Sequence, residues 1–274
     1  MTDAPADTRH DKMRAPEVYL AISAEGVEEM NRPTASLFWS GVAAGLLIAF
    51  SVVAEALLRA HLPATEWRPL VENFGYSAGF LIVIMGRMQL FTENTITTVL
   101  PTVAEPSWDN IGCSARIWGI VFGANLVGAA VAALFLAEAG SLAAPVNEAI
   151  GAISAHAIEG SGLDIFIRAI PAGILIAAIV WMLPSAETST FWVVLFFTYL
   201  IALGDFAHVV AGSVEAFYVL FTDEAASLSL VLGFLIPAFL GNVVGGTVVF
   251  AVLAYGQVRE ELPDNDESEG PGPH

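Results

Sequence analysis

The sequence predicts an all-α membrane protein with six transmembrane helices, and three observations support that prediction. Of its 274 residues, 56% are hydrophobic and only 14% are charged, and the mean hydropathy is +0.69. This composition is typical of chains that lie in a bilayer rather than of soluble domains. Six stretches are long enough to cross hydrocarbon, which takes about 20 apolar residues. Polar segments interrupt two of these stretches.

The six candidate spans are residues 36–58, 70–90, 113–136, 165–183, 191–220 and 228–255. Polar interruptions fall in the second and fifth spans, at 87–94 and 204–208. Hydrocarbon offers no partners to backbone amides, so a spanning helix breaks only where protein or a cavity shelters the break. We therefore expect half-helices after each break, and a path for a solute between them.

The two halves of the chain repeat one pattern, in which an intact span, a broken span and an intact span follow one another. Three spans per half is an odd number, so the second half is expected to enter the membrane from the opposite side, as a 3+3 inverted repeat. Small residues surround Asn125 in the third span and Asn242 in the sixth. Small residues let helices approach closely. We favour a packing role for both asparagines, each bonded to a neighbouring helix or an exposed carbonyl.

Outside the spans the chain is polar, which divides it into three expected parts. Residues 1–33 form a cytoplasmic segment with a short amphipathic helix over 16–30, and no cleavable signal peptide is expected. Residues 34–257 form the transport domain, and residues 258–274 form an acidic, disordered tail. Basic residues near the spans favour one side, which predicts that both termini are cytoplasmic in an inner (plasma) membrane. That side carries Arg9, Lys12, Arg14, Arg32, Arg116 and Arg259, against Arg59, Arg68 and Arg168 on the other.

Charge and residue types exclude several classes of function. The formal net charge of −18 argues against nucleic acid as a partner, because phosphate binding needs a basic face. One cysteine, Cys113, cannot form an internal disulfide. No zinc or redox motif and no Ser/His/Asp or multi-histidine constellation falls on facing spans. We therefore expect no enzyme, no metal and no cofactor, with membrane lipid as the surrounding partner.

Four short motifs occur in an order and spacing that resemble the formate/nitrite transporter family. They are Leu90-Phe91-Thr92, Phe206-Ala207-His208 with Ala211, Asn125-Leu126-Val127-Gly128, and Gly241-Asn242 with Gly245-Gly246. The match runs from about residue 36 to 255 and resembles a divergent branch, closer to little-characterised inner-membrane members than to the formate or nitrite channels. The resemblance implies an aquaporin-like six-helix protomer and a homopentamer.

The resemblance also implies where the pore lies. By position, His208 is the central histidine and Thr92 is the loop threonine that faces it. The apolar constrictions fall on Phe91 and Phe80 toward the cytoplasm, and on Tyr76 and Ile201 toward the outside. Tyr76 replaces the family's usual phenylalanine, which adds a polar edge to the outer constriction.

A buried histidine between apolar constrictions suits the transport of a weak acid. A bare anion meets a large desolvation barrier there, whereas its neutral conjugate acid meets a much smaller one. Imidazole gains and loses a proton near neutral pH. His208 can therefore protonate or hydrogen-bond an anion such as formate, nitrite or hydrosulfide, with Thr92 orienting either group. Alternatively, His208 only bonds a carbonyl that the helix break exposes.

Several residues depart from the family's pattern. The outer-vestibule lysine of the anion-transporting members has no counterpart in residues 155–159, so the attracting cation is missing. Ala207 stands for the usual glutamate before the histidine, Gly212 for an asparagine, and Asp205 for a glycine. Arg87 is a basic residue that the better-known members lack.

Opposite charges in two facing loops are expected to pair, because neither is stable alone in apolar surroundings. We therefore expect a salt bridge from Arg87 to Asp205, or failing that to Glu93, Glu55 or Glu215. As an ion pair Arg87 would hold the loops, and as a free cation it would replace the missing lysine. Glu93 and Glu215 are also expected in corresponding places of the two halves, as a quasi-symmetric pair of carboxylates.

Three functions remain from the sequence. The first is a channel or proton-coupled carrier for small monovalent weak-acid anions that uses His208. The second is a pore for a neutral small solute or a cation, supported by the missing lysine and the acids near the loops. The third, a non-transporting membrane protein, is the least favoured.

Overall fold

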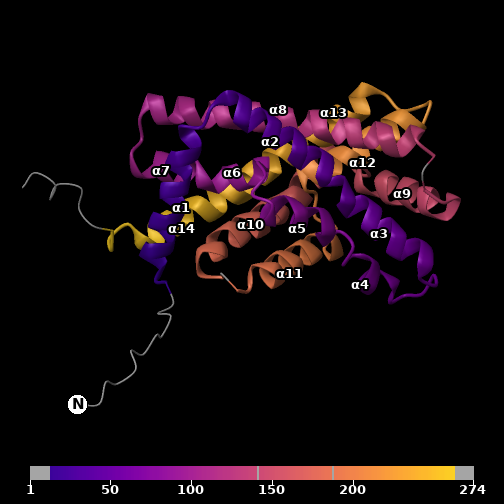
Figure 1. Cartoon of the computed structure of the whole chain (residues 1–274), viewed down its shortest axis with the longest axis horizontal. Helices are drawn as coiled ribbons and strands as arrows, with labels where there is room; N and C mark the ends of the chain where they lie inside the picture. Colours follow the sequence, from indigo (N-terminus) through magenta and orange to yellow (C-terminus); the bar gives the residue numbers. More distant parts are fainter. Residues whose placement is uncertain (1–12, 141, 187, 263–274) are drawn as a thin grey trace, which may run out of the picture.

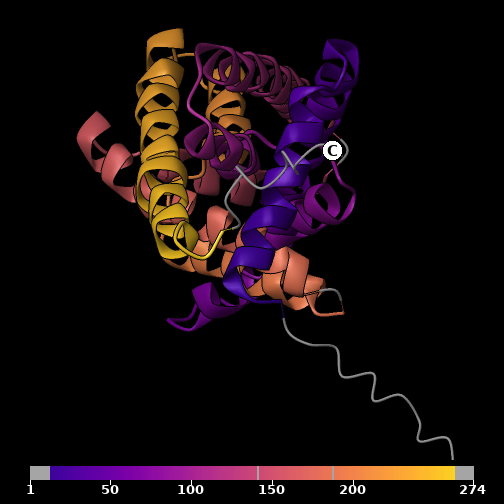
Figure 2. The ribbon, with the colours of Figure 1, turned by 90° about the vertical axis from the view of Figure 1, so that its left-hand side faces the viewer.

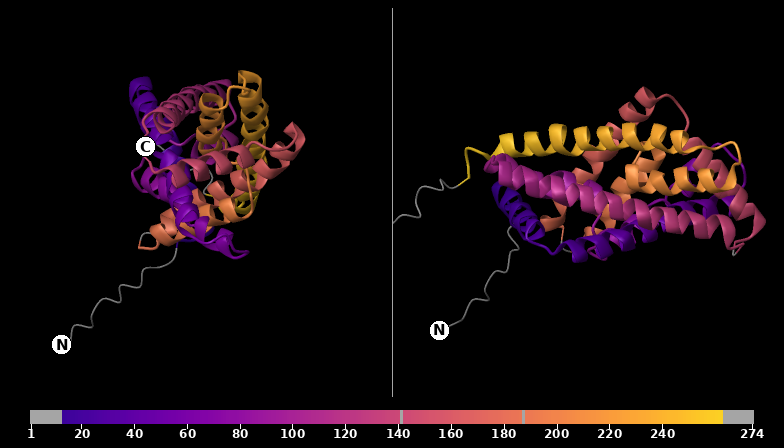
Figure 3. Two further views of the ribbon diagram at one scale, coloured as in Figure 1. Left: turned by 90° about the vertical axis from the view of Figure 1, so that its right-hand side faces the viewer. Right: turned by 90° about the horizontal axis from the view of Figure 1, so that it is seen from above.

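Helices make up all the regular structure in the residues that the computed structural model describes, which are 13–140, 142–186 and 188–262. Four helical segments are long and apolar enough to cross a membrane, namely Thr34–His61, Trp108–Glu138, Gly162–Ser185 and Leu228–Val258. Figure 1 shows them side by side in an elongated bundle. From above, in Figure 3, α8 and the helix of α13 and α14 run along its length.

The long segments contain several labelled elements. The first joins α2 (Thr34–Leu47) to α3 (Ala49–His61), and the second is α8 (Trp108–Glu138). The third is α10 (Gly162–Met182) with the short η1 (Leu183–Ser185). The fourth runs from α13 (Leu228–Val243) through the π-helical η2 (Val244–Ala251) into α14 (Val252–Val258).

The two expected interruptions separate short helices. In the first half, α5 (Ser77–Met85) is followed by α6 (Phe91–Thr97) and α7 (Val99–Ala104). In the second half, α11 (Thr190–Leu203) is followed by α12 (Val209–Thr222). The continuous helix expected from residue 70 is wrong, because α4 (Arg68–Glu72) ends and tight turns precede α5. Gly75 lies against the backbone of α3 there, and a side chain would collide with Glu55.

Both interruptions end a helix in the same way. Arg87 and Asp205 adopt φ values of 54° and 53°, in the left-handed region where a glycine is usual. The next amide reaches back five residues, from Met88 to the Val83 carbonyl and from Phe206 to the Ile201 carbonyl. This is the Schellman arrangement, which stops an α-helix. The chain then runs extended into the next half-helix.

The helix seams also repeat. Gly45 of α2 packs on the backbone of Asn125, and Gly173 of α10 packs on the backbone of Asn242. A side chain at either glycine would collide with the asparagine's carbonyl. Small residues thus bring α2 against α8, and α10 against α13, at backbone contact distance.

The helix expected over 16–30 is present as α1 (Ala15–Met30). The apolar residues Val18 and Ile22 of this amphipathic helix are buried inside the protein, in one cluster with Leu100. The Tyr19 hydroxyl donates to the Leu100 carbonyl at 3.0 Å. Figure 1 places α1 beside α7 and α14 at one end of the bundle, the end that faces the viewer in Figure 2.

The opposite end of the bundle carries α4 and α9 (Ala144–Ala157) in Figure 1. The acidic tail expected over 258–274 lies outside the described residues from position 263 onward, as does the start of the N-terminal segment.

Candidate functional site

The first loop is held by one asparagine side chain. Asn125 Oδ1 accepts a hydrogen bond from the Phe91 amide at 2.9 Å. Its Nδ2 donates to the carbonyls of Gly41 at 2.8 Å and Gln89 at 2.9 Å. The asparagine is fully buried, so its bonds to Phe91 and Gln89 satisfy backbone groups that the break removed from a helix, while its bond to Gly41 joins the loop to α2.

The second loop is held in the same way by Asn242. Its Oδ1 accepts from the Val209 amide at 2.8 Å, and its Nδ2 donates to the carbonyls of Ala169 at 2.8 Å and Ala207 at 2.9 Å. Each asparagine therefore joins a broken span to an intact one. These contacts agree with the expected packing role of both residues.

His208 and Thr92 meet where the two half-helices begin. Thr92 Oγ1 lies 2.8 Å from His208 Nε2, and both residues are buried. His208 also caps α12, because its Nδ1 accepts from the Ala211 amide at 3.2 Å. A backbone amide can only donate, so the proton of the neutral ring is assigned to Nε2, which donates to Thr92 Oγ1. The hydroxyl proton of Thr92 then remains available for another acceptor.

Aromatic rings surround this polar pair. The Phe80 ring lies edge-on to His208 at a centroid distance of 4.9 Å, and Tyr76 lies 5.2 Å from Phe80. Phe91 stacks on Phe239 at 4.9 Å, within a buried aromatic cluster that includes Phe122. The four residues expected at constrictions are all at most 7% exposed.

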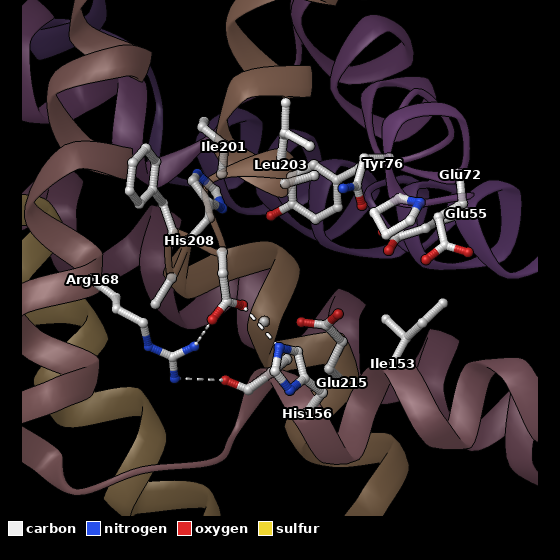
Figure 4. Close-up of a pocket in the computed structure, with 18 of the residues that line it drawn as sticks. Glu55, Glu72, Tyr76, Ile153, His156, Arg168, Ile201, Leu203, His208 and Glu215 are labelled. Carbon is white, nitrogen blue, oxygen red and sulfur yellow. Dashed lines mark hydrogen bonds and ion pairs between the residues drawn. The ribbon is translucent and has the colours of Figure 1, made fainter. Parts of the chain in front are cut away.

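A cavity of about 430 Å³ ends at His208. Tyr76 and Ile201 line it, while Phe80, Phe91 and Thr92 do not belong to its wall. The remaining wall comes from α3, α4, α9, α10, α11, α12, α13 and the second loop, at the end of the bundle opposite α1. Figure 4 shows the charged side chains that face this space.

The expected salt bridge between Arg87 and Asp205 is wrong. Arg87 pairs with Glu25 of α1 at 3.2 Å, and its side chain is 82% exposed. Asp205 instead pairs with Arg168 at 2.7 Å and lies 3.4 Å from His156. The reason is that the two residues hold equivalent places in loops that face opposite ends of the bundle. In the described residues Arg87 forms no ion pair with Glu93, Glu55 or Glu215 either.

The expected correspondence of Glu93 and Glu215 is also wrong. Glu93 lies in the first turn of α6, while Glu215 lies nearly two turns into α12. The Phe91 amide donates to Asn125 Oδ1 as the Val209 amide donates to Asn242 Oδ1, so Phe91 and Val209 hold equivalent positions. Counted from these two residues, the position equivalent to Glu215 is Thr97. Only Glu215 lines the cavity.

Two cations do line the cavity, which corrects the expectation that none is present. Arg168 of α10 also donates to the Glu159 carbonyl at 2.7 Å, and Arg59 of α3 lies 3.6 Å from Glu72. Both arginines were visible in the sequence among the outer basic residues. From the sequence, a vestibule cation was expected only within residues 155–159, whereas Arg168 reaches the cavity from α10.

Within the described ranges, no three His, Cys, Asp or Glu side chains gather closely enough to hold a metal ion.

Known proteins with similar sequences belong to one family. The sequence profile of the family described as "Formate/nitrite transporter" matches residues 16–256. The chain is 36% identical to the "Inner membrane protein YfdC" of Escherichia coli (strain K12) over 256 residues, which cover 93% of this chain and 83% of that protein. It is 27% identical to the "Formate channel FocA" of Haemophilus influenzae over 244 residues, covering 78% and 84%.

Solved structures share the fold. A structure described as "FNT family ion channel" superposes with a TM-score of 0.76 at 21% identity, covering 88% of this chain and 98% of the other. A second, "Pentameric formate channel with formate bound", gives a TM-score of 0.72 at 21% identity, covering 83% and 98%.

Proposed function

The chain belongs to the formate/nitrite transporter family, and from that premise we propose that it conducts small monovalent weak-acid anions of the formate, nitrite or hydrosulfide class across the inner membrane. The observation that supports this proposal is the hydrogen bond between His208 and Thr92 at the closed end of the cavity.

The His208–Thr92 pair offers hydrogen bonds at the place where an anion would lose its hydration shell. Transfer of an isolated carboxylate into apolar surroundings is far more costly than transfer of the neutral acid. The Thr92 hydroxyl has a proton to donate once His208 Nε2 donates to its oxygen. An oxygen of the substrate can accept a hydrogen bond from the Thr92 hydroxyl beside the imidazole. The site therefore favours a small acid over an apolar solute of the same size.

The constrictions are assigned to either side of this pair. Tyr76 and Ile201 narrow the inner part of the cavity beside His208, while Phe80 and Phe91 close the path toward the α1 end. The proposed state is closed on the α1 side, and the first movement would be a displacement of the Phe91 ring from its stack with Phe239.

The membrane arrangement is part of the same proposal. Residues 34–257 cross the bilayer six times as an inverted 3+3 repeat in which the second and fifth crossings are broken at 86–90 and 204–208. Both termini lie in the cytoplasm, so the cavity opens to the outside. The described relative with bound formate is pentameric, and we propose a homopentamer for this chain, with one pore in each protomer.

A second function, a pore for a neutral solute or a cation, is favoured by the wall of the cavity. Four acidic side chains line it, against two arginines. An excess of carboxylates disfavours the entry of an anion and favours a cation.

Flux in proteoliposomes separates the two functions. Purified wild-type protein and His208→Ala would be assayed with formate, nitrite, hydrosulfide, methylammonium and glycerol at acidic and neutral pH. The proposal predicts anion flux that rises as pH falls and that His208→Ala removes. Flux of methylammonium or glycerol alone would instead establish the second function.

A further inference from the structure

Two buried carboxyl groups face the cavity without a counter-charge. Glu55 of α3 is 8% exposed and Glu215 of α12 is 6% exposed, and both line the cavity that ends at His208. Among the described residues, neither side chain forms a hydrogen bond or an ion pair. In Figure 4, Glu215 lies between the side of the cavity that carries His208 and the side that carries Glu55 and Glu72.

The other acids of the cavity are compensated. Glu72 lies 2.9 Å from Arg68 and 3.6 Å from Arg59, and Asp205 pairs with Arg168 and His156. Both arginines of the cavity wall are therefore already paired with other carboxylates. Among the described residues, this leaves Glu55 and Glu215 as the carboxyl groups of the cavity wall without an ion-pair partner.

The charges that act on each carboxyl differ. Glu215 is influenced by the carboxylates of Glu55 and Asp205, with no cation among its charged neighbours. Glu55 is influenced by Glu72, Asp205 and one cation, Arg59. An uncompensated buried charge costs several kcal/mol per ion in protein, and a proton is the smallest group that can remove it.

Glu215 also occupies the right place on α12. His208, Gly212 and Glu215 all line the cavity, and their spacing puts them on one face of the helix. The rise of an α-helix separates the first and last by about 10 Å along the axis. Gly212 leaves no side chain between them. A solute that moves from the open end toward His208 therefore passes Glu215 first.

His208 itself is poorly placed to supply the proton. Its Nδ1 accepts from the Ala211 amide, and its Nε2 donates to Thr92. A second proton on the ring would have to displace the Ala211 bond that caps α12. The neutral ring can orient a substrate, but the ring has no spare proton to transfer.

We propose that Glu215, with Glu55 as its proton-exchanging partner, is the group that protonates the incoming anion before it reaches His208. In this step the O–H bond of the Glu215 carboxylic acid breaks, an O–H bond forms on the anion, and a carboxylate remains on Glu215. Glu55 returns a proton to that carboxylate, and a hydronium ion at the open end of the cavity then protonates Glu55 and leaves as water. The neutral acid then passes the constriction to Thr92 and His208.

The groups that face this pair come from five other places. They are Glu72 of α4, Tyr76 before α5, His156 of α9, Arg168 of α10 and Asp205 of the second loop. Glu72 and Asp205 each lie against an arginine, whereas Glu55 and Glu215 have no ion-pair partner among the described residues, so we assign the pH dependence of loading to Glu55 and Glu215. This inference rests on the proposed anion transport.

The test replaces each acid by its amide, which keeps the shape and removes the transferable proton. Anion flux and its pH dependence would be measured in proteoliposomes for wild type, Glu215→Gln, Glu55→Gln and the control Glu224→Gln, which is exposed on the loop after α12. We expect Glu215→Gln to lower flux at acidic pH roughly a hundredfold, as the loss of a proton-transferring group does, and to flatten the pH profile. The control should match wild type.

A second measurement is independent of transport. Infrared spectra of the substrate-free protein should contain a carboxylic acid C=O band at neutral pH that Glu215→Gln removes and Glu224→Gln retains. Glu215→Asp, which keeps an acid, should retain the band and the shape of the pH profile. It also serves as the folded comparison if Glu215→Gln does not assemble.

The outcomes separate the two proposals. If wild type carries no anion while the infrared band is present and depends on Glu215, the transport proposal fails and the proton site stands. If wild type carries anions and Glu215→Gln retains full pH-dependent flux, the proton-donor inference is overturned and the transport proposal stands. An infrared band that Glu215→Gln leaves unchanged also overturns the inference.

Discussion

The two loops share one backbone design and differ in chemistry. Each follows a glycine, Gly86 or Gly204, places the next residue in the left-handed region, and ends at an amide bonded to an asparagine of an intact span. Within that shared frame, the position that holds Leu90 in the first loop holds His208 in the second. Both loops therefore have the same backbone arrangement, but only the second carries an imidazole ring at this position.

The neighbouring positions extend this contrast. Gln89 of the first loop corresponds to Ala207 of the second, and Thr97 of α6 corresponds to Glu215 of α12. The cavity opens only on the side of the second loop, and α1 covers the opposite end. The repeated backbone design therefore produces both helix breaks. Different side chains at equivalent positions make the two ends of the bundle chemically unequal.

The largest expected loss of assembled protein comes from replacing the asparagines that hold the two loops. Both loops should depend on their asparagine to the same extent. Asn125→Leu and Asn242→Leu each leave one amide and one carbonyl of a loop without the asparagine partner, and one unsatisfied buried group costs roughly 1–3 kcal/mol. We expect both variants to be recovered poorly as assembled protein. Size-exclusion chromatography in detergent after a temperature series measures this. Loss of assembly in only one variant would show that the loops are not held equivalently, and Asn31→Ala on α1 is the control.

The seam glycines provide the next test. Gly45→Ala and Gly173→Ala should each destabilise by about 1–3 kcal/mol, because the added methyl collides with the backbone of Asn125 or Asn242. Gly123→Ala on α8 meets nothing within 4 Å and serves as the matched control. Thermal unfolding followed by tryptophan fluorescence would rank the three. Equal unfolding midpoints for all three variants would contradict the close approach at the seams.

The charged residues of the loops should differ in importance. Arg168→Gln breaks a 2.7 Å pair with Asp205 and a bond to the Glu159 carbonyl, at a side chain that is 21% exposed. Arg87→Gln breaks only an exposed pair with Glu25, and such pairs contribute about 0–1 kcal/mol. We expect Arg168→Gln to lower both thermal stability and anion flux, and Arg87→Gln to leave assembly intact. A larger loss in Arg87→Gln would reverse this order.

The smallest effect concerns α1, which has no counterpart at the other end. The backbone amide of Arg14, and then its side chain, hold the pKa of the Glu17 carboxyl below its usual value of 4.5. A carboxyl group whose pKa is lower in the folded than in the unfolded state stabilises the folded state at pH values above its unfolded-state pKa. This stabilisation is lost as the pH falls through the folded-state pKa. Amide exchange in the first turn of α1 should therefore accelerate below about pH 4.5. Exchange that does not change across this range would show that the first turn does not depend on Glu17.

The sequence predicted the helix interruptions and the asparagine contacts because general constraints dictate them. Hydrocarbon forces a broken backbone to find partners, and the small residues around Asn125 and Asn242 mark where helices touch. The contact between Thr92 and His208 followed from the family resemblance.

The ion pairs could not be predicted in the same way. Which end of the bundle Arg87 and Asp205 face depends on the orientation of two loops in an inverted arrangement, and hydropathy does not encode it. Arg168 reaches Asp205 from α10, 37 residues away in the chain. The expected match of Glu93 with Glu215 failed because the alignment of the half-helices depends on which amide each asparagine accepts, a detail that only coordinates supply.

The two loops are proposed to differ at one equivalent position, where the second loop places the His208 imidazole beside Thr92 and the first loop places only the apolar side chain of Leu90. The direct test is formate flux in proteoliposomes for His208→Asn and Leu90→Ala, the two equivalent positions. Asparagine keeps a side-chain acceptor at the cap of α12 and lacks the imidazole. We predict that His208→Asn loses pH-dependent flux while Leu90→Ala keeps it. Equal flux in both variants, or loss in Leu90→Ala alone, would contradict the account.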